Sequence, residues 1–172
     1  MKLYKINKTK WREYKQFLLA AVKNEPFAFS QDINDYKKDI QDKILEQKIA
    51  GEFNNKKYLY FIAEDNKTII GSIACSFSKN RKTSHVVELF KFYVLPDFRN
   101  LGIGKQLLNL IFSYLEKNYP EIEKLKLYVY ATQKVALAIY LKKGFSICGK
   151  LSKEMKIEQQ YYDLYLMEKF LK

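Results

Sequence analysis

Residues 94–108 read VLPDFRNLGIGKQLL, and this stretch decides the fold of the 172-residue chain. It leaves the apolar end of a predicted strand, turns at Pro96 and at two glycines, and enters an apolar repeat of helical spacing. Gly102 and Gly104 remove two side chains from the turn. The backbone amides of residues 100–105 can therefore point at one concavity in front of a helix N-terminus, which predicts an anion site.

Several nucleotide-binding sites share a strand, a glycine-containing loop and a helix, and the residues distinguish among them. A P-loop needs GxxxxGK[ST], but these two glycines are too close together and no GK[ST] follows. A dinucleotide-binding fingerprint needs a third glycine near Gln106 or Leu107 and an acidic residue ending the next strand, and neither is present. Arg99 and Lys105 flank the loop and would add charge-assisted contacts to a phosphate. The stretch alone predicts either a phosphate site or a tight turn without a ligand.

Hydrophobic period and turn residues predict the elements on either side of the loop. The expected strands are 2–7, 56–64, 68–78, 85–96, 124–131, 145–152 and 159–169, and the expected helices are 9–24, 32–51, 102–119 and 132–144. A helical crossover joins strands 85–96 and 124–131, so these two should lie parallel. The order β-α-α-β-β-β-α-β-α-β-β predicts an α/β (α+β) fold with a mixed, mostly antiparallel sheet of about seven strands and helices on both faces.

Composition limits the class of protein and its partners. The chain contains 48% hydrophobic and 16% aromatic residues, which is enough for the core of one domain over residues 1–172. Its formal charge of +12 attracts polyanions. The lysines are spread singly and form no basic arm, so a solvated surface explains them and no nucleic acid is expected as partner.

Cysteine and histidine usage indicates the compartment and argues against a metal site. Cys75 and Cys148 lie in apolar stretches without CxxC spacing, which predicts two small buried thiols in a reducing compartment. His85 is the sole histidine and has no neighbouring ligands, so no metal is expected. The longest apolar run, residues 17–22, is too short to span a bilayer. We expect a cytoplasmic protein, monomeric or homodimeric, without a membrane association.

Two motifs in this order resemble the GCN5-related N-acetyltransferase (GNAT) superfamily. The family loop [RQ]xxGx[GA] follows a strand ending in VxP, which corresponds here to VLPDFRNLGIG at residues 94–104. The second family motif, an Asn and an Ala before a YxKxGF helix end, corresponds to QKVALAIYLKKGF at residues 133–145. The predicted element order also matches the family along essentially the whole chain.

The resemblance implies an N-acetyltransferase of this single domain, which moves an acetyl group from acetyl-CoA to a primary amine by direct attack in a ternary complex. In the family the loop amides cradle the CoA pyrophosphate, and the pantetheine arm runs along the preceding strand where it splays from residues 128–131. The cofactor-binding residues so implied are Phe92, Tyr93, Val94, Arg99, Asn100, Leu101, Gly102, Ile103, Gly104, Lys105, Gln133 and Tyr140. Gln133 replaces the usual Asn, so its contact with pantetheine differs or is lost.

Two catalytic residues are expected, because attack on a thioester needs a base for the amine and a proton for the leaving thiolate. Tyr140 stands at the family's acid position, and the alternative is a buried core aromatic. Glu88 is a carboxylate in an apolar strand, which is costly unless it is paired or functional. Some family members use a glutamate there as base, and the alternative is an ion pair with a lysine. Tyr128 stands where ribosomal-protein acetyltransferases of the family carry a glutamate base.

The acceptor groove of the superfamily lies between the first two helices and the last hairpin, here residues 24–32 and 153–163. Aromatic and acidic residues expected there are Phe27, Phe29, Tyr161, Tyr162, Asp32, Glu52, Glu158 and Asp163. The acceptor stays open among polyamines, small metabolite amines and protein amines. Two other functions also stay open: a CoA-sensing regulatory domain without turnover, and a basic nucleic-acid-binding module.

Overall fold

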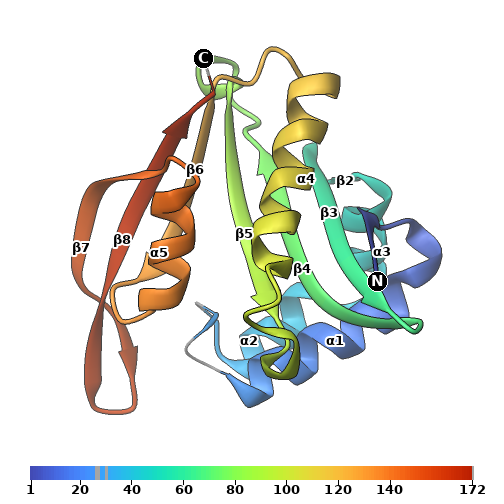
Figure 1. Cartoon of the computed structure of the whole chain (residues 1–172), viewed down its shortest axis with the longest axis horizontal. Helices are drawn as coiled ribbons and strands as arrows, with labels where there is room; N and C mark the ends of the chain where they lie inside the picture. Colours follow the sequence, from blue (N-terminus) through green and yellow to red (C-terminus); the bar gives the residue numbers. More distant parts are fainter. Residues whose placement is uncertain (26–27, 30, 172) are drawn as a thin grey trace.

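A mixed sheet forms the middle layer of the protein, with helices on both faces (Figure 1). The computed structural model describes residues 1–25, 28–29 and 31–171. The sheet has eight strands in the order β1-β3-β4-β5-β6-β8-β7, and β2 pairs with β3. Every neighbouring pair is antiparallel except β5 and β6, which are parallel as their helical crossover predicts.

The elements follow the predicted order closely. The strands are β1 (Lys2–Lys5), β2 (Glu52–Phe53), β3 (Lys56–Asp65), β4 (Thr68–Phe77), β5 (Val86–Val94), β6 (Lys124–Tyr130), β7 (Ser146–Ile157) and β8 (Gln160–Phe170). The helices are α1 (Trp11–Asn24), α2 (Ile33–Asp39), α3 (Asp42–Ala50), α4 (Ile103–Asn118) and α5 (Lys134–Lys142). The predicted mixed α/β fold is therefore confirmed.

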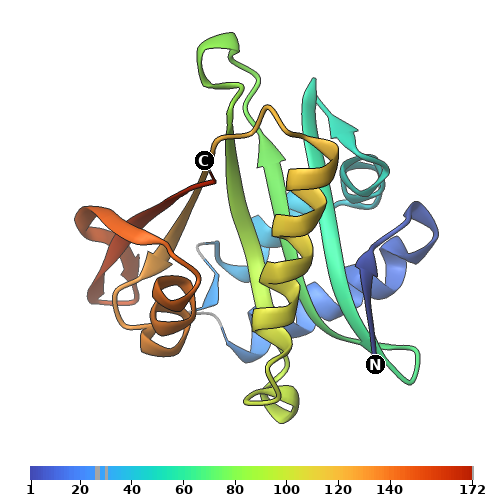
Figure 2. The same cartoon turned by 45° about the horizontal axis from the view of Figure 1, so that its top comes forward.

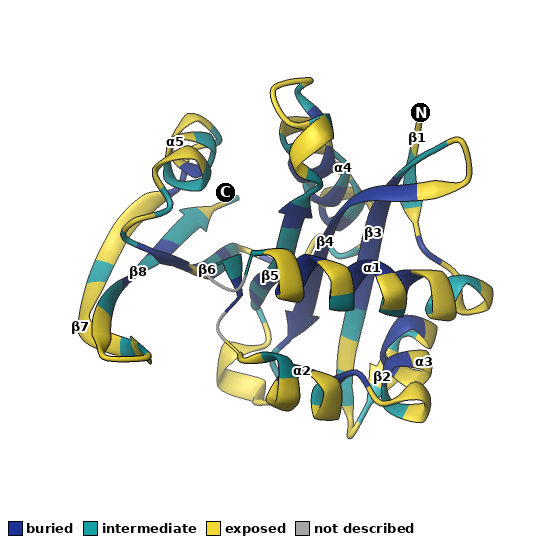
Figure 3. Cartoon of the chain, turned by 90° about the horizontal axis from the view of Figure 1, so that it is seen from below, coloured by how far each residue is buried: buried dark blue, intermediate teal, exposed yellow. Residues whose placement is uncertain are grey.

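The sheet carries a hydrophobic core on each face, and the burial pattern of Figure 3 follows the two cores. One core contains the apolar stripe of α4, including Leu107 and Ile111, together with Tyr140 of α5. The other contains residues of α1, α2 and α3, including Tyr14 and Leu45. Because both faces are covered, β4 is buried over most of its length and β3 over its central residues 59–63, as their apolar runs predict.

The single helix predicted over residues 32–51 is wrong: the structure has two helices, α2 and α3. Gln41 adopts extended backbone angles of φ −54° and ψ 146° and restarts the helix. Ile40 and Leu45 are buried on either side of the break, so the apolar period continues through it. No Pro or Gly marks the break, and the period alone could not predict it.

Three further details differ from the sequence-based expectation. The short strand β2 was not predicted, because two residues are too few to show the alternation of apolar and polar residues that is typical of a strand. Strand β7 continues to Ile157, so much of the segment assigned to a loop is a strand that ends in a tight turn. Cys148 is exposed, whereas Cys75 is buried and both are free thiols. Cys148 lies at a register shift of β7, which pairs only with β8 and leaves most of its side chains in solvent.

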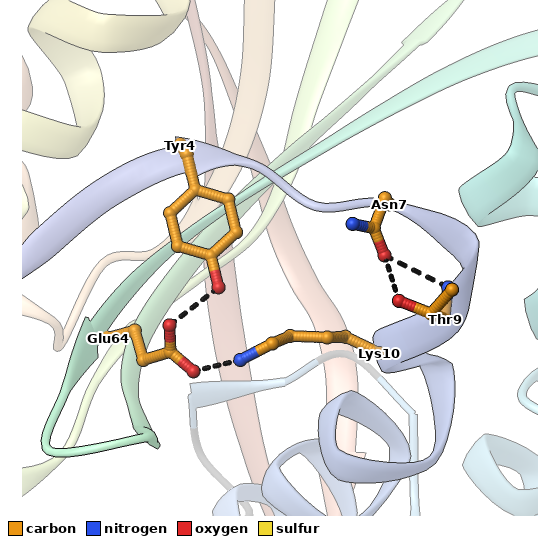
Figure 4. Close-up of polar contacts among 5 residues, drawn as sticks. All are labelled: Tyr4, Asn7, Thr9, Lys10 and Glu64. Carbon is orange, nitrogen blue, oxygen red and sulfur yellow. Dashed lines mark hydrogen bonds and ion pairs between the residues drawn. The ribbon is translucent and has the colours of Figure 1, made fainter.

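The N-terminal strand is fixed to β3 by a polar network around Glu64 (Figure 4). The Tyr4 hydroxyl donates to Glu64 Oε2 over 2.7 Å, and the Lys10 ammonium forms an ion pair with the same carboxylate. Asn7, which lies between Tyr4 and Lys10 in the sequence, accepts a hydrogen bond from the Thr9 amide and so caps a short 3₁₀ helix. Hydrogen bonds from Lys10 and then from Tyr4 lower the pKa of Glu64 below its ordinary value of 4.5.

We expect Glu64→Gln to lower the free energy of unfolding at neutral pH by about 1 kcal/mol, because the ion pair and the charge-assisted hydrogen bond are lost. A carboxylate with a lowered folded-state pKa stabilises the fold above its ordinary pKa, and this contribution disappears as the pH falls through the lowered value. Urea denaturation measures the free energy of unfolding of both proteins. The difference between wild type and Glu64→Gln should be smaller well below pH 4.5 than at neutral pH. The exposed Glu116→Gln serves as control; an equal loss at both pH values would contradict the role of Glu64.

None of the helices in the described part of the chain is both long and apolar enough to cross a membrane.

Candidate active site

Strands β5 and β6 lie side by side at their amino-terminal ends and separate toward their carboxyl ends (Figures 1 and 2). Their pairing joins residues 86–88 to residues 124–126 and, within the described chain, goes no further. Beyond Glu88, the edge of β5 that faces β6 has no strand partner. An extended ligand can pair with backbone groups at such an edge. The expectation that these two strands splay is confirmed.

A β-bulge at Lys91 bends β5 beside this split. Between Phe90 and Tyr93, three steps along β5 match two steps along β4 from Ala74 to Ser72. Lys91 adopts a left-handed φ of 52°, and its carbonyl accepts a hydrogen bond from the Ser72 hydroxyl over 2.9 Å. Because a bulge increases the local twist and bend of its strand, it helps β5 to diverge from β6.

A cavity of about 220 Å³ lies in the split between the two strands. It is lined by residues 88–92 of β5, by residues 128–130 of β6, by residues of α5 and by the segment before α2. Four of the predicted site residues come together in its wall: Glu88, Phe92, Gln133 and Tyr140. The sequence separates these residues widely, and the parallel pairing of β5 and β6 together with the packing of α5 brings them to one place.

The predicted glycine loop lies at the carboxyl end of β5 and leads into α4. Asn100 and Gly102 have φ values of 62° and 75°, in the left-handed region that glycine adopts without strain. In the described part of the chain, none of the backbone amides of residues 100–105 donates a hydrogen bond to a protein acceptor. Free consecutive amides at the N-terminus of a 16-residue helix are an arrangement that can bind an anion.

Gly104 is required by close packing inside this loop. A Cβ atom at Gly104 would lie 2.9 Å from Cζ of Phe92, which is closer than carbon atoms normally approach. The Phe92 ring in turn packs against the Tyr140 ring, with 5.5 Å between the ring centroids. The Phe92 ring therefore lies between Gly104 of the loop and the Tyr140 ring in the wall of the cavity.

The other predicted cofactor-binding side chains differ in their availability. Arg99 points back toward the strand: its Nη2 binds Glu25 Oε1 at 2.6 Å and its Nε donates to the Val94 carbonyl at 3.0 Å. Tyr93 and Ile103 bury their side chains in opposite cores, so they offer only backbone groups to a ligand. The side chains of Leu101 and Lys105 are exposed at the loop.

Tyr140 lies in the wall of the cavity and packs against aromatic neighbours. Its side chain is 6% exposed, and its ring contacts Phe92 and Phe145. Its hydroxyl makes no hydrogen bond to the described residues. Burial raises the pKa of Tyr140 well above its ordinary value, so the phenol stays protonated at neutral pH and offers a hydrogen-bond donor.

Glu88 shows both of the features that its sequence context suggested. It lines the cavity, and its carboxylate also forms an ion pair with Lys126 of β6, with 3.2 Å between Oε2 and Nζ. Because the two residues are register partners where β5 and β6 still pair, the ion pair lies at the point where the split begins. The described residues contain no group of His, Cys, Asp and Glu side chains that could hold a metal ion.

A second cavity, of about 860 Å³, lies between α2, α3 and the tip of the β7–β8 hairpin. The predicted groove residues Phe29, Asp32 and Glu158 line it. It shares Phe29, Gln31 and Tyr130 with the smaller cavity, so the two are adjacent.

The remaining predicted groove residues are not brought to this cavity. Tyr161, Tyr162 and Glu52 are not among its lining residues. Asp163 also lies outside the lining, and it binds Lys150 at 2.8 Å across the β7–β8 hairpin. Phe27 lies outside the described residues. Of the expected aromatic residues that the structure describes, Phe29 lines this cavity.

The cavity residues that the sequence analysis missed include Tyr36, Asp39, Lys48 and Lys91. The signal for Lys91 was present, since it stands between two Phe residues in VVELFKFYV just as Glu88 stands between Val and Leu. A charged residue in a central apolar strand is costly unless it is paired or functional. Tyr36 and Asp39 gave no such signal, because both fit an ordinary amphipathic helix.

Comparison with models of protein families establishes the family of the chain. The model of the acetyltransferase (GNAT) family matches residues 11–145. The chain belongs to this family. The matched residues run from α1 to the residue Phe145 after α5, and so include β5, the glycine loop and Tyr140. The resemblance of the two motifs to GNAT proteins is confirmed.

Individual relatives of this GNAT protein agree with that assignment. An uncharacterized N-acetyltransferase of Methanocaldococcus jannaschii is 33% identical over 88 residues, which is 50% of this chain and 38% of the archaeal protein. A GNAT acetyltransferase from Streptococcus pneumoniae superposes with a TM-score of 0.81 at 22% identity over 99% of both chains. A putative acetyltransferase from Salmonella typhimurium, solved with its cofactor acetyl-CoA, gives a TM-score of 0.76 at 15% identity over 100% of this chain and 94% of that chain. At these identities the two solved structures establish a shared fold.

Proposed function

We propose that this GNAT protein is an acetyl-CoA-dependent N-acetyltransferase that acts on a primary amine by direct attack in a ternary complex. The observation that carries the proposal is the continuity of two features. The unpaired edge of β5 is followed, after the short 3₁₀ helix Pro96–Phe98, by the row of free amides at residues 100–105. Coenzyme A has a matching succession of groups, because an amide-containing arm is followed by a pyrophosphate.

The residues at these features fit such a ligand. The amides of residues 100–105 would hold the pyrophosphate, and Gly104 lets the first turn of α4 pack against Phe92, because a Cβ there would lie 2.9 Å from Phe92 Cζ. Backbone groups of residues 92–94 and the side chain of Gln133 would hold the pantetheine arm. When bound, acetyl-CoA would supply an acetyl group activated as a thioester. Family membership supports this use of the site.

Glu88 and Tyr140 would then manage the protons of the reaction. The amine nitrogen bonds to the carbonyl carbon while the carbon–sulfur bond breaks, so one proton must leave the amine and one must reach the thiolate. Glu88 would take the proton of the amine. Tyr140 would donate its hydroxyl proton to the sulfur as the carbon–sulfur bond breaks, and the proton taken by Glu88 would return to the Tyr140 oxygen through solvent, so that the protons balance. The raised pKa that follows from burial keeps the Tyr140 hydroxyl protonated before the reaction.

Thermal melting and CoA release test the proposed function together. Acetyl-CoA should raise the melting temperature, and at least one amine in a panel of amino acids, polyamines and peptides should release free CoA. Binding without release across the whole panel would favour a CoA-sensing domain. Affinity for nucleic acid that falls steeply with salt, without acetyl-CoA binding, would favour a basic binding module.

Glu88→Gln should lower kcat/KM at neutral pH by roughly 100-fold, because removal of a general base typically costs that much or more. The loss should shrink at high pH, where the acceptor amine is already deprotonated. Steady-state CoA release across pH measures both effects. Glu116→Gln, the same change at an exposed position of α4, should leave the rates unchanged; a full rate in Glu88→Gln at neutral pH would show that Glu88 only pairs with Lys126.

A further inference from the structure

Two buried lysines share a single carboxylate beside the proposed active site. Lys91 Nζ lies 3.2 Å from Asp39 Oδ2, and Lys48 Nζ lies 2.6 Å from Asp39 Oδ1. The two lysine side chains are 6% and 10% exposed. The Lys91–Asp39–Lys48 triad therefore places two buried positive charges on one carboxylate that is 30% exposed, and unbalanced buried charge is costly.

No other carboxylate of the described chain pairs with either lysine. Asp35, on the same helix as Asp39, pairs with Lys38 instead. Asp32 accepts hydrogen bonds from two amides in the first turn of α2 and so caps that helix. Aromatic faces offset part of the positive charge, since Lys91 Nζ lies 4.3 Å from the centroid of the Tyr36 ring. Burial lowers the pKa of Lys91, as expected where a charge lacks full compensation.

A buried hydroxyl next to the triad also lacks a partner. Tyr36 is 2% exposed, and within the described structure its hydroxyl makes no hydrogen bond. Buried polar groups nearly always have a hydrogen-bond partner, so an unpaired hydroxyl indicates a missing ligand or water. Tyr36 lines the smaller cavity together with Lys91. The positively charged Lys91 and the unpaired Tyr36 hydroxyl thus lie in the wall of the same cavity.

The triad lies where the two cavities approach each other. Asp39 and Lys48 line the larger cavity, whereas Lys91 lines the smaller one with Glu88 and Tyr140. An acceptor that enters through the larger cavity to reach Glu88 must therefore pass the triad. The charge there attracts anions and repels a second cation on the acceptor.

We propose that the Lys91–Asp39–Lys48 triad, together with the Tyr36 hydroxyl, binds a carboxylate of the acceptor. This inference rests on the proposed function and names the acceptor class: small amines of the amino-acid type, which carry a carboxylate near the reacting amine. Polyamines and lysine side chains of proteins do not fit, because they bring a cation without an adjacent carboxylate.

Matched acceptor pairs test the inference. Amino acids and their carboxamides differ only in the anionic group, and kcat/KM for each follows from CoA release. The wild type should favour the amino acids at least about tenfold, mainly through KM, because a charge-assisted contact to a buried cation is lost in the amide. Lys91→Met should reduce this preference to within about twofold. Lys37→Met, the same change at an exposed position of α2, should retain it.

A binding measurement gives a second readout that does not depend on turnover. N-acetylated amino acids should raise the melting temperature of the wild type more than their carboxamides do, and Tyr36→Phe should reduce the difference. If Lys91→Met fails to fold, two other variants replace it. Lys91→Arg should keep the preference for acceptors with a carboxylate, and Tyr36→Phe should weaken that preference.

Two outcomes distinguish failure of the proposed acceptor class from failure of the proposed acetyltransferase function. Acetyl transfer to carboxamides or polyamines as fast as to amino acids would overturn the acceptor class and leave the acetyltransferase intact. Failure of acetyl-CoA to bind, or of any acceptor to react, would overturn the proposed function. In that case equal binding of N-acetyl amino acids and their amides would overturn the carboxylate site as well, whereas preferential binding would support it.

Discussion

Replacing Tyr140 by Phe should lower kcat by at least about 100-fold while the affinity for acetyl-CoA changes by less than about twofold. The ring of Tyr140 is held by Phe92 and Phe145, and phenylalanine keeps those contacts. Only the hydroxyl is lost, and it is the donor expected to stabilise the departing thiolate. Single-turnover CoA release and a separate titration with acetyl-CoA distinguish the rate from the affinity.

Tyr14→Phe is a matched control for this change. Tyr14 is also a fully buried phenol, but it belongs to the core under α1 and lines neither cavity. Its replacement should leave kcat within about twofold of the wild-type value. A Tyr140→Phe protein with normal turnover for every active acceptor would contradict the role of this hydroxyl.

Gly104→Ala should raise the Kd for acetyl-CoA by roughly tenfold, or about 1.4 kcal/mol. The added Cβ would lie 2.9 Å from Cζ of Phe92, so either the first turn of α4 or the Phe92 ring must move. Movement of the turn misplaces amides of the anion site, and movement of the ring disturbs Tyr140. The clash should also cost about 1 kcal/mol of stability, even though alanine favours a helix over glycine.

Gly149→Ala gives the corresponding control. A Cβ at Gly149 meets only Leu166 Cβ at 3.7 Å and Leu166 Cδ2 at 4.0 Å, which are ordinary contacts. Isothermal titration of both variants with acetyl-CoA should therefore show a weakened Gly104→Ala and an unchanged Gly149→Ala. Wild-type affinity in Gly104→Ala would show that the loop adjusts without loss of its anion site.

The sequence predicted those parts of the fold in which local pattern and tertiary packing agree. The glycine loop is one of them, because Gly102 takes the left-handed φ of 75° that the turn requires. The break between α2 and α3 could not be predicted, since both helices bury the same apolar stripe. The bulge at Lys91 was equally hidden, because it depends on a three-against-two register with β4 that no local pattern records.

The candidate site was predicted unevenly for the same reason. Glu88, Phe92, Gln133 and Tyr140 do line one cavity. The family resemblance pointed to the last three, and the apolar neighbours of Glu88 in its strand pointed to Glu88. The direction of the Arg99 side chain could not be predicted, because it depends on Glu25, which is distant in sequence. The acceptor side was predicted least well. Its lysine–aspartate triad joins three separate elements, and no short motif describes such a group.

A crystal structure with acetyl-CoA tests the central claim most directly. The proposal predicts that pyrophosphate oxygens accept hydrogen bonds from amides within residues 100–105, and that the pantetheine arm lies along the free edge of β5. The thioester sulfur should lie within hydrogen-bond distance of the Tyr140 hydroxyl, in the cavity that Glu88 also lines. Acetyl-CoA bound away from the glycine loop, or with its thioester outside the split between β5 and β6, would contradict the account.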